Sequence, residues 1–219
     1  MTADGEVFAV IAGGGTAGHV LPGLAIARAL RDRGLSVHYV GAERGIEGRL
    51  VPAADVPLTL LPGRGIQRSF TPRALVANVG AVAGILRAVL QAVGLVRRLR
   101  PKVVVAVGGF ASVPAVIGAL VARVPVVVAE QNTHPGAANR FSARFAKASA
   151  VAFEGTPLPR AVVTGNPIRA EVAAVDRDRD HVAARARFGV GPGQDLVLVS
   201  GGSLGALSIN RAVLDLVEG

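Results

Sequence analysis

Short apolar segments alternate along the chain with longer segments in which apolar residues recur every three or four positions. The short segments are residues 7–12, 36–41, 58–61, 103–107 and 126–129. Each is typical of a buried strand, and the longer segments between them are typical of helices. This alternation predicts an α/β fold built on a doubly wound parallel sheet. Such sheets bind ligands beyond the carboxyl ends of their strands, so the residues that follow each apolar segment are the first candidates for a site.

The first strand runs into a glycine-rich stretch, residues 13–18, which precedes a helix-like segment. Glycines let a ligand approach the backbone closely, and the free amides at a helix start favour phosphate. The stretch also fits the G-x-G-x-x-G pattern of dinucleotide sites, with Glu43 after the next strand. Thr16 and His19 add a hydroxyl and an imidazole, which a redox cofactor site does not need. The stretch therefore predicts an anion cradle.

Two further predicted strands end in glycine-rich or polar turns. A second glycine turn, from Gly108 to Ser112, follows the fourth strand. The fifth strand ends at Glu130, and Asn132 and Asn139 follow it. Polar side chains that emerge from an apolar strand are costly to hold without a ligand or a hydrogen-bond network. For the two asparagines, capping of a turn and a helix is the other interpretation.

A long apolar helix is predicted to start at Thr71 and Pro72, which suit the N-cap and the first helical position, and to stop before Pro101. Polar residues interrupt every window long enough to span a bilayer, so a transmembrane segment is not expected. Two interpretations stay open: a buried crossover helix, or one whose N-terminal end also contacts a membrane. The residues of this candidate membrane face are Arg64, Arg68, Phe70, Arg73, Leu75 and Val79.

The chain changes character near residue 168. A short strand around residues 162–163 is predicted to end a first domain, residues 1–168, and residues 169–219 are predicted to be a linker and the first βα unit of a second. This unit has a predicted strand at 196–200, a third glycine turn and a helix to residue 217. One βα unit cannot form a domain, so the second domain is predicted to be incomplete. The acidic run 176–180 contains a D-x-D pattern, which we interpret as a solvated helix start.

Composition narrows the partners and the compartment. The 219 residues carry a formal net charge of +9, which favours anionic partners. The arginines lack interleaved aromatic residues, so nucleic acid is not expected. Because the sequence has no cysteine, disulfides and cysteine-based metal sites are excluded, and a reducing cytoplasm is the simplest expectation. The first apolar segment is too short for a signal peptide, so none is expected.

Five motifs resemble, in the same order, the MurG family of glycosyltransferases: GGGTAGH from Gly13, GGFASVPA from Gly108, EQNTHPGAANR from Glu130, TGNPIR from Thr164 and GGSLGA from Gly201. The resemblance implies an inverting transfer of N-acetylglucosamine from UDP-N-acetylglucosamine to the 4-hydroxyl of undecaprenyl-diphospho-N-acetylmuramoyl-pentapeptide (lipid I), which makes lipid II for peptidoglycan. It implies a GT-B architecture of two Rossmann-like domains that face each other across a cleft, the second truncated here. It also implies no cofactor, no metal, and a peripheral location at the cytoplasmic face of the cell membrane. An anionic membrane surface and cell-wall synthesis proteins are the implied partners.

The resemblance assigns residues 1–168 to the acceptor and the membrane, and residues 169–219 to the start of the donor domain. His19 and Glu130 become the catalytic candidates. Either could take the proton of the acceptor hydroxyl, and a neutral His19 could instead orient the acceptor. The positions matched to UDP-N-acetylglucosamine are Thr16, Ala17, Gly18, Asn132, Arg169 and Ser203. The positions matched to the acceptor diphosphate are Gly14, Gly15, Gly108, Gly109, Ser112 and Asn139.

Four positions depart from the family pattern, where glycine, tyrosine, histidine and glutamine are usual: Ala17, Phe110, Ala129 and Leu204. These changes bear on ligand affinity more than on the fold. Most of the donor domain is absent, so this chain alone is not expected to catalyse transfer. Three rival functions remain: another GT-B glycosyltransferase, a non-catalytic module that docks a lipid-linked precursor, and, with least support, a dinucleotide-dependent oxidoreductase.

Overall fold

The computed structural model describes residues 7–63, 72–201 and 205–218 of the chain. The chain divides into two compact units, of which the first ends at Arg169 and the second begins at Ala170. All the strands of the described residues belong to the first unit. The described part of the second unit consists of three helices, α6 (Ala170–Ala173), α7 (Arg177–Arg187) and α8 (Leu207–Glu218), and their connections.

The first unit is built on a seven-stranded sheet in which every pair of neighbours is parallel. The strands are β1 (Ala9–Gly13), β2 (Val37–Ala42), β3 (Leu58–Leu61), β4 (Val103–Gly108), β5 (Val126–Glu130), β6 (Ala148–Val151) and β7 (Ala161–Val163). Their order is β3-β2-β1-β4-β5-β6-β7, which reverses direction between β1 and β4. The predicted doubly wound parallel sheet is confirmed, although β6 was not foreseen.

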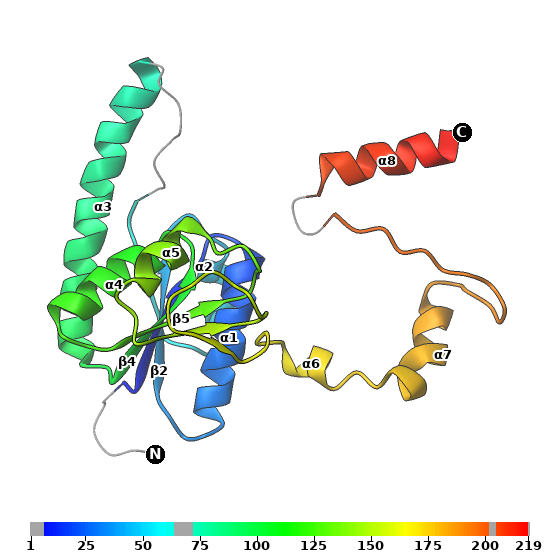
Figure 1. The fold of residues 1–219 in the computed structure, drawn as a ribbon, viewed down its shortest axis with the longest axis horizontal. Helices are drawn as coiled ribbons and strands as arrows, with labels where there is room; N and C mark the ends of the chain where they lie inside the picture. The colour runs from blue at the N-terminus through cyan, green and yellow to red at the C-terminus, as the bar shows by residue number, and fades with distance from the viewer. Residues whose placement is uncertain (1–6, 64–71, 202–204, 219) are drawn as a thin grey trace. The chain divides into compact units, whose positions relative to one another are not determined.

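Helices cover the sheet on both faces (Figure 1). On one face, α3 (Pro72–Leu99), α4 (Ser112–Val121) and α5 (Ala137–Ala143) pack on a core that contains Val104 and Val128. On the other, α1 (Ala17–Arg31) and α2 (Glu47–Leu50) pack around Ile11 and Val105, and the exposed 3₁₀ helix η1 (Pro52–Ala54) follows α2. Because the strands are parallel and buried, their sequences are nearly continuous apolar runs.

The long helix α3 connects β3 to β4 and is a crossover helix, which both interpretations predicted. Among residues 83–99 of α3, whose burial the structure describes, Ala88, Ala92, Leu95 and Val96 are buried. Small residues bring it close to α4, since a Cβ atom on Gly118 would lie 2.9 Å from the carbonyl oxygen of Ala92. The first turns of α3 project beyond the sheet and the other helices of the unit (Figure 1). Its predicted N-cap, Thr71, lies outside the described residues.

The strand predicted at residues 196–200 is not formed, and this prediction was wrong. These residues have no regular secondary structure, and Val197 and Leu198 are largely exposed. A strand is stabilised by hydrogen bonds to a neighbouring strand, and the described part of the second unit contains none. The helix that was predicted to follow is present as α8.

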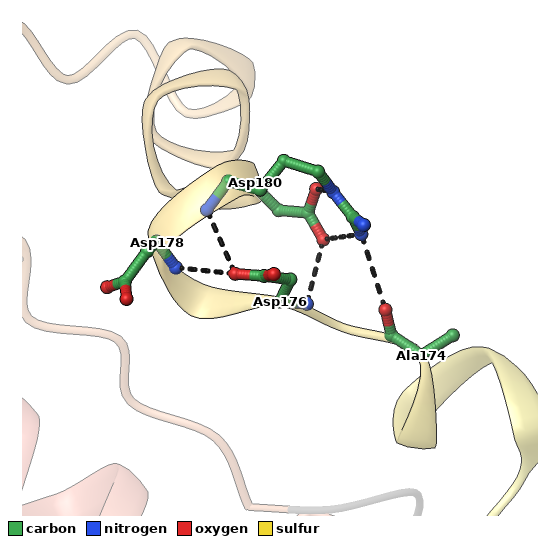
Figure 2. Close-up of polar contacts among 5 residues, drawn as sticks. Ala174, Asp176, Asp178 and Asp180 are labelled. Atoms are coloured by element: carbon green, nitrogen blue, oxygen red, sulfur yellow. Dashed lines mark hydrogen bonds and ion pairs between the residues drawn. The ribbon is translucent and has the colours of Figure 1, made fainter.

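The alternating Asp-Arg segment 176–180 forms the N-cap and first turn of α7, as the sequence indicated (Figure 2). The side chain of Asp176 accepts hydrogen bonds from the amides of Asp178 and Arg179, both at 3.0 Å. In return, the amide of Asp176 donates to the carboxylate of Asp180, which also pairs with the Arg179 guanidinium at 2.7 Å. The aspartates of the D-x-D pattern therefore serve the start of an exposed helix.

Candidate functional site

Three loops gather at the carboxyl ends of adjacent strands, where the order of the sheet reverses. We call residues 14–16, after β1, the first glycine loop. Residues 108–111, which end β4 and lead to α4, are the second glycine loop, and residues 131–136, after β5, are the β5 loop. In open α/β sheets this reversal point opens a crevice at which ligands bind. The candidate site of the first unit is therefore this edge of β1, β4 and β5.

The two glycine loops interlock through their backbones. The amide of Gly14 donates to the carbonyl oxygen of Gly108 at 3.1 Å. Gly108 and Gly109 have φ angles of 99° and 81°, which residues with a side chain rarely adopt. A Cβ atom on Gly109 would lie 2.1 Å from the carbonyl oxygen of Gly14. The buried hydroxyl of Ser112 donates to the carbonyl oxygen of Gly109 at 2.8 Å, so Ser112 braces the second glycine loop from within.

The start of α1 offers backbone donors. Thr16 is the N-cap in an extended conformation, but its hydroxyl makes no capping hydrogen bond. The amides of Ala17 and Gly18 lie in the first turn, where a helix has no internal acceptors. The amides of Gly14 and Gly15 are already occupied, by Gly108 and by a carboxylate described below. The donors left for a ligand are thus those of residues 16–18, while Gly14 and Gly15 contribute close approach of the backbone.

The start of α4 offers fewer backbone donors, because the amide of Val113 donates to the carbonyl oxygen of Phe110 and Pro114 has no amide hydrogen. Its N-cap, Ala111, has no side chain that can cap the first turn, and Ser112 donates its hydroxyl proton elsewhere. Two helices with uncapped N-termini, α1 and α4, therefore follow the adjacent strands β1 and β4. Each N-terminus carries a partial positive charge from the helix dipole. The edge is suited to an anion that spans both, such as a diphosphate.

His19 lies on α1 with its ring against the second glycine loop. A Cβ atom on Gly108 would lie 2.9 Å from the ring atoms Cε1 and Nδ1, so only glycine leaves room for the imidazole there. Nδ1 is buried and has no hydrogen-bond partner in the part of the chain that the structure describes. A buried nitrogen without a partner costs free energy.

Glu130, the last residue of β5, is the centre of a hydrogen-bond network. Its side chain is 3% exposed. Oε1 accepts from the amide of Asn132 at 3.0 Å and from its side chain at 2.9 Å. Oε2 accepts from the amide of Gly136 at 3.2 Å and from the side chain of Asn139 at 2.9 Å. A carboxylate has about four acceptor positions, so Glu130 is saturated by the β5 loop and α5.

The two asparagines differ in what they leave for a ligand. Asn139 is 1% exposed and also donates to the carbonyl oxygen of Ala129, while its own Oδ1 is buried without a partner among the described residues. Asn139 lies near His19, since the same Cβ position on Gly108 would be 3.5 Å from its Nδ2. Asn132 is exposed on the β5 loop.

Several predicted residues are not brought into this cluster. Arg169 is exposed at the end of the first unit. Ser203, Arg64, Arg68 and Phe70 lie outside the described residues. Arg73, Leu75 and Val79 fall in the first turns of α3, and their side chains lie outside the described part of the structure.

Sequence analysis missed one buried carboxylate at the site, Glu47. It lies at the start of α2, is fully buried, and accepts a hydrogen bond from the amide of Gly15. The acid that the sequence singled out, Glu43, is exposed. No local pattern distinguishes the two, because the Gly15 amide that Glu47 binds lies on a distant loop.

Within the described residues, no helix is long and apolar enough to cross a membrane. The same residues contain no group of three or more histidine, aspartate or glutamate side chains that could hold a metal ion.

Comparison with known proteins places this arrangement in a class of enzymes. Residues 9–151 match the model of the glycosyltransferase family 28 N-terminal domain. The chain belongs to this family. The match covers β1 to β6, which includes both glycine loops and the β5 loop.

Similar proteins carry names from peptidoglycan synthesis. The chain is 44% identical over 207 residues, 93% of its length, to a protein of Nocardioides sp. named UDP-N-acetylglucosamine–N-acetylmuramyl-(pentapeptide) pyrophosphoryl-undecaprenol N-acetylglucosamine transferase, and 42% identical over 215 residues to a Cutibacterium acnes protein of the same name. Of the solved structures, it is similar to Acinetobacter baumannii MurG, with a TM-score of 0.66 and 27% identity over 94% of this chain. The resemblance to the MurG family and the GT-B fold prediction are confirmed. The chain spans 55% or 56% of the length of these three proteins.

Proposed function

We propose that the chain is the acceptor-binding half of an inverting glycosyltransferase. The reaction moves N-acetylglucosamine from UDP-N-acetylglucosamine to the 4-hydroxyl of undecaprenyl-diphospho-N-acetylmuramoyl-pentapeptide, the two substrate types that the names of its relatives contain. The observation that carries the proposal is the pair of uncapped helix N-termini at the interlocked glycine loops, with the imidazole of His19 between them.

The acceptor diphosphate binds across the two helix starts. The amides of residues 16–18 and of the second glycine loop donate to its oxygens, and the two helix dipoles stabilise its negative charge. Gly109 keeps the loops close enough to act on one ligand. This arrangement explains why the site needs glycines and backbone amides more than charged side chains.

His19 is the better placed of the two catalytic candidates. In the transfer, the acceptor 4-hydroxyl oxygen forms a bond to the anomeric carbon of N-acetylglucosamine from the face opposite UDP, the bond to UDP breaks, and the hydroxyl proton passes to a base. The imidazole of His19 lies in the first turn of α1 beside the second glycine loop, whereas all four acceptor positions of Glu130 are occupied. Glu130 then positions Asn132 and Asn139 at the crevice, and Asn132, Arg169 and Ser203 hold the donor UDP as its negative charge develops.

A peripheral position on the cytoplasmic face of the membrane follows from this acceptor. The diphosphate of a lipid-linked substrate lies at the headgroup layer, so the edge with the glycine loops has to approach that layer. Arg73, Leu75 and Val79 of the candidate membrane face belong to the first turns of α3, which project from the unit (Figure 1). Cell-wall synthesis proteins are the further partners we expect there.

Glycosyl transfer tests the proposal. This chain, joined to the second half of the Nocardioides relative, is incubated with UDP-N-acetylglucosamine and a soluble lipid I analogue, and the intact relative is the positive control. We expect transfer, and we expect His19→Ala to lower kcat by roughly a hundredfold or more with little change in UDP binding. Absence of transfer while the relative is active would contradict the function. Unchanged turnover with weakened UDP binding would move His19 to the donor side.

A further inference from the structure

The carboxylate of Glu47 closes the floor of the first glycine loop. Its Oε1 accepts from the amide of Ala42 at 2.7 Å and from that of Gly15 at 3.2 Å, and its Oε2 accepts from the amide of Gly15 at 3.0 Å. The side chain is completely buried. Hydrogen bonds to a buried charge are among the stronger ones in proteins, so this contact fixes the position of Gly15.

The surroundings of Glu47 are shaped to its side chain. Cβ atoms on Gly14, Gly41 and Gly45 would lie 2.0 Å, 2.3 Å and 2.0 Å from the nearest atoms of Glu47. Three glycines from three segments thus leave space that the glutamate fills. Burial, and next to it the charge of Glu47, raise the pKa of the Tyr39 hydroxyl, so Tyr39 stays neutral beside the carboxylate. The carboxylate of Glu47 is therefore an integral part of the first glycine loop.

This contact changes which donors a phosphate can use. In dinucleotide-binding folds, the glycine turn lets the pyrophosphate reach the backbone, and the helix N-terminus holds it. Here the amide of Gly15 is occupied by Glu47, and that of Gly14 by Gly108. A second anion against Gly15 would also lie next to a negative charge, which disfavours it.

We propose that Glu47 is a positioning and specificity-determining residue of the first glycine loop: it occupies the Gly15 amide and thereby directs a ligand diphosphate to the amides of residues 16–18. The proposal rests on the proposed function for the nature of the ligand, and on the hydrogen bonds of Glu47 for the rest. It accounts for a loop that has the G-x-G-x-x-G spacing of a dinucleotide site but excludes a pyrophosphate from the floor of the turn.

The first test concerns the free chain and needs no ligand. Amide hydrogen exchange is followed by NMR in the wild type, in Glu47→Gln and in the matched control Glu43→Gln, which changes the exposed glutamate of the same segment. Glutamine keeps the size of the side chain but loses the charge and turns one acceptor into a donor. We expect exchange at Gly15 to accelerate about tenfold or more in Glu47→Gln and to be unchanged in Glu43→Gln. Unchanged exchange at Gly15 in a folded Glu47→Gln chain would overturn the proposal.

The second test adds geranyl diphosphate, a soluble prenyl diphosphate, to the same three chains. In the wild type and the control, we expect the amide signals of Ala17 and Gly18 to shift and that of Gly15 to stay. In Glu47→Gln, we expect Gly15 to shift as well. A wild-type Gly15 signal that shifts as much as that of Gly18 would overturn the directing role.

The two tests separate this proposal from the proposed function. If geranyl diphosphate moves none of these amides, the diphosphate site and the directing role both fail, and the exchange data alone decide whether Glu47 positions the loop. The diphosphate could instead shift the amide signals of Ala17 and Gly18 while exchange and ligand response at Gly15 are the same in Glu47→Gln as in the wild type. In that case the proposed function stands and the role of Glu47 is refuted.

Discussion

The amide of Gly14 donates a hydrogen bond of 3.1 Å to the carbonyl oxygen of Gly108, and this contact joins the loops that follow two adjacent strands. The strands meet in the sheet because β1 pairs with β4, although β2, β3 and α3 separate them along the chain. A change in the backbone of one loop is therefore expected to shift the other.

Replacement of Gly109 tests this coupling. A Cβ atom there would clash with the carbonyl oxygen of Gly14 and would require a φ angle of 81°. We expect Gly109→Ala to lower the free energy of unfolding by about 1–3 kcal/mol, measured in urea, and to abolish binding of a prenyl diphosphate. Gly136→Ala is the matched control, since a Cβ at Gly136 meets nothing within 4 Å. Equal effects of the two substitutions would refute the coupling.

Substitutions of Glu130 and of His19 are expected to differ in their effect on the free energy of unfolding. The carboxylate of Glu130 accepts hydrogen bonds from four donors, and in Glu130→Gln the new NH₂ group would face two of them. We therefore expect a loss of about 1–3 kcal/mol in the free energy of unfolding. His19→Gln removes a ring whose Nδ1 has no partner and should cost little. Urea denaturation of the two variants measures both. A stable Glu130→Gln chain would show that the network does not hold the β5 loop.

The pH dependence of stability is expected to involve His38. Burial, and after it the charge of Arg98, lower the pKa of His38 below the usual 6.5. As the pH falls through 6.5, the unfolded chain therefore gains a proton before the folded chain does, and stability is lost from there down to the lowered folded pKa. His38→Gln keeps a hydrogen-bond partner for the Thr59 hydroxyl. It should reduce the change of the thermal unfolding midpoint between pH 7 and pH 5. His134→Gln, on an exposed loop, is the control. The same slope in His38→Gln and the wild type would exclude His38 as the cause.

Membrane attachment is expected at the start of α3. Replacing Arg64, Arg68 and Arg73 by serine should reduce co-sedimentation with anionic vesicles, because each cation contributes about 1 kcal/mol near an acidic surface. The matched control replaces Arg97, Arg98 and Arg100, which lie at or just beyond the other end of α3. Salt should weaken binding of the wild type. Equal binding to neutral and anionic vesicles, or equal losses in the two triple variants, would contradict a membrane face at this end.

The sequence predicted those parts of the fold that have a local signal. Strands such as β1 and β4 are apolar runs that end in glycine turns, and Pro72 marks the start of α3. β6 was missed because its four residues continue an alanine-rich helical segment without a turn signal. The strand at residues 196–200 was predicted from an apolar run, but a strand also needs a neighbour, which an isolated run does not reveal.

The candidate site was predicted only in outline. Glycine loops and polar residues at strand ends can be found from sequence, because topology brings those ends together. The hydrogen-bond partner of each polar atom cannot be found from the sequence. Glu47 and Glu130 both accept hydrogen bonds from backbone amides of a glycine-containing loop. The Gly15 amide that Glu47 binds lies on a distant segment. The saturation of Glu130 depends on how the β5 loop folds back towards the carboxylate. Such contacts are set by tertiary packing.

The central claim is that the two glycine loops bind a lipid-linked diphosphate acceptor. Its most direct test is a calorimetric titration of this chain with a short-chain lipid I analogue, beside NAD and beside the Gly109→Ala variant. The account predicts saturable binding of the analogue, loss of that binding in Gly109→Ala with retention in Gly136→Ala, and no binding of NAD. Binding of NAD that is lost in Gly109→Ala, or binding of the lipid I analogue that is unchanged in Gly109→Ala, would contradict it.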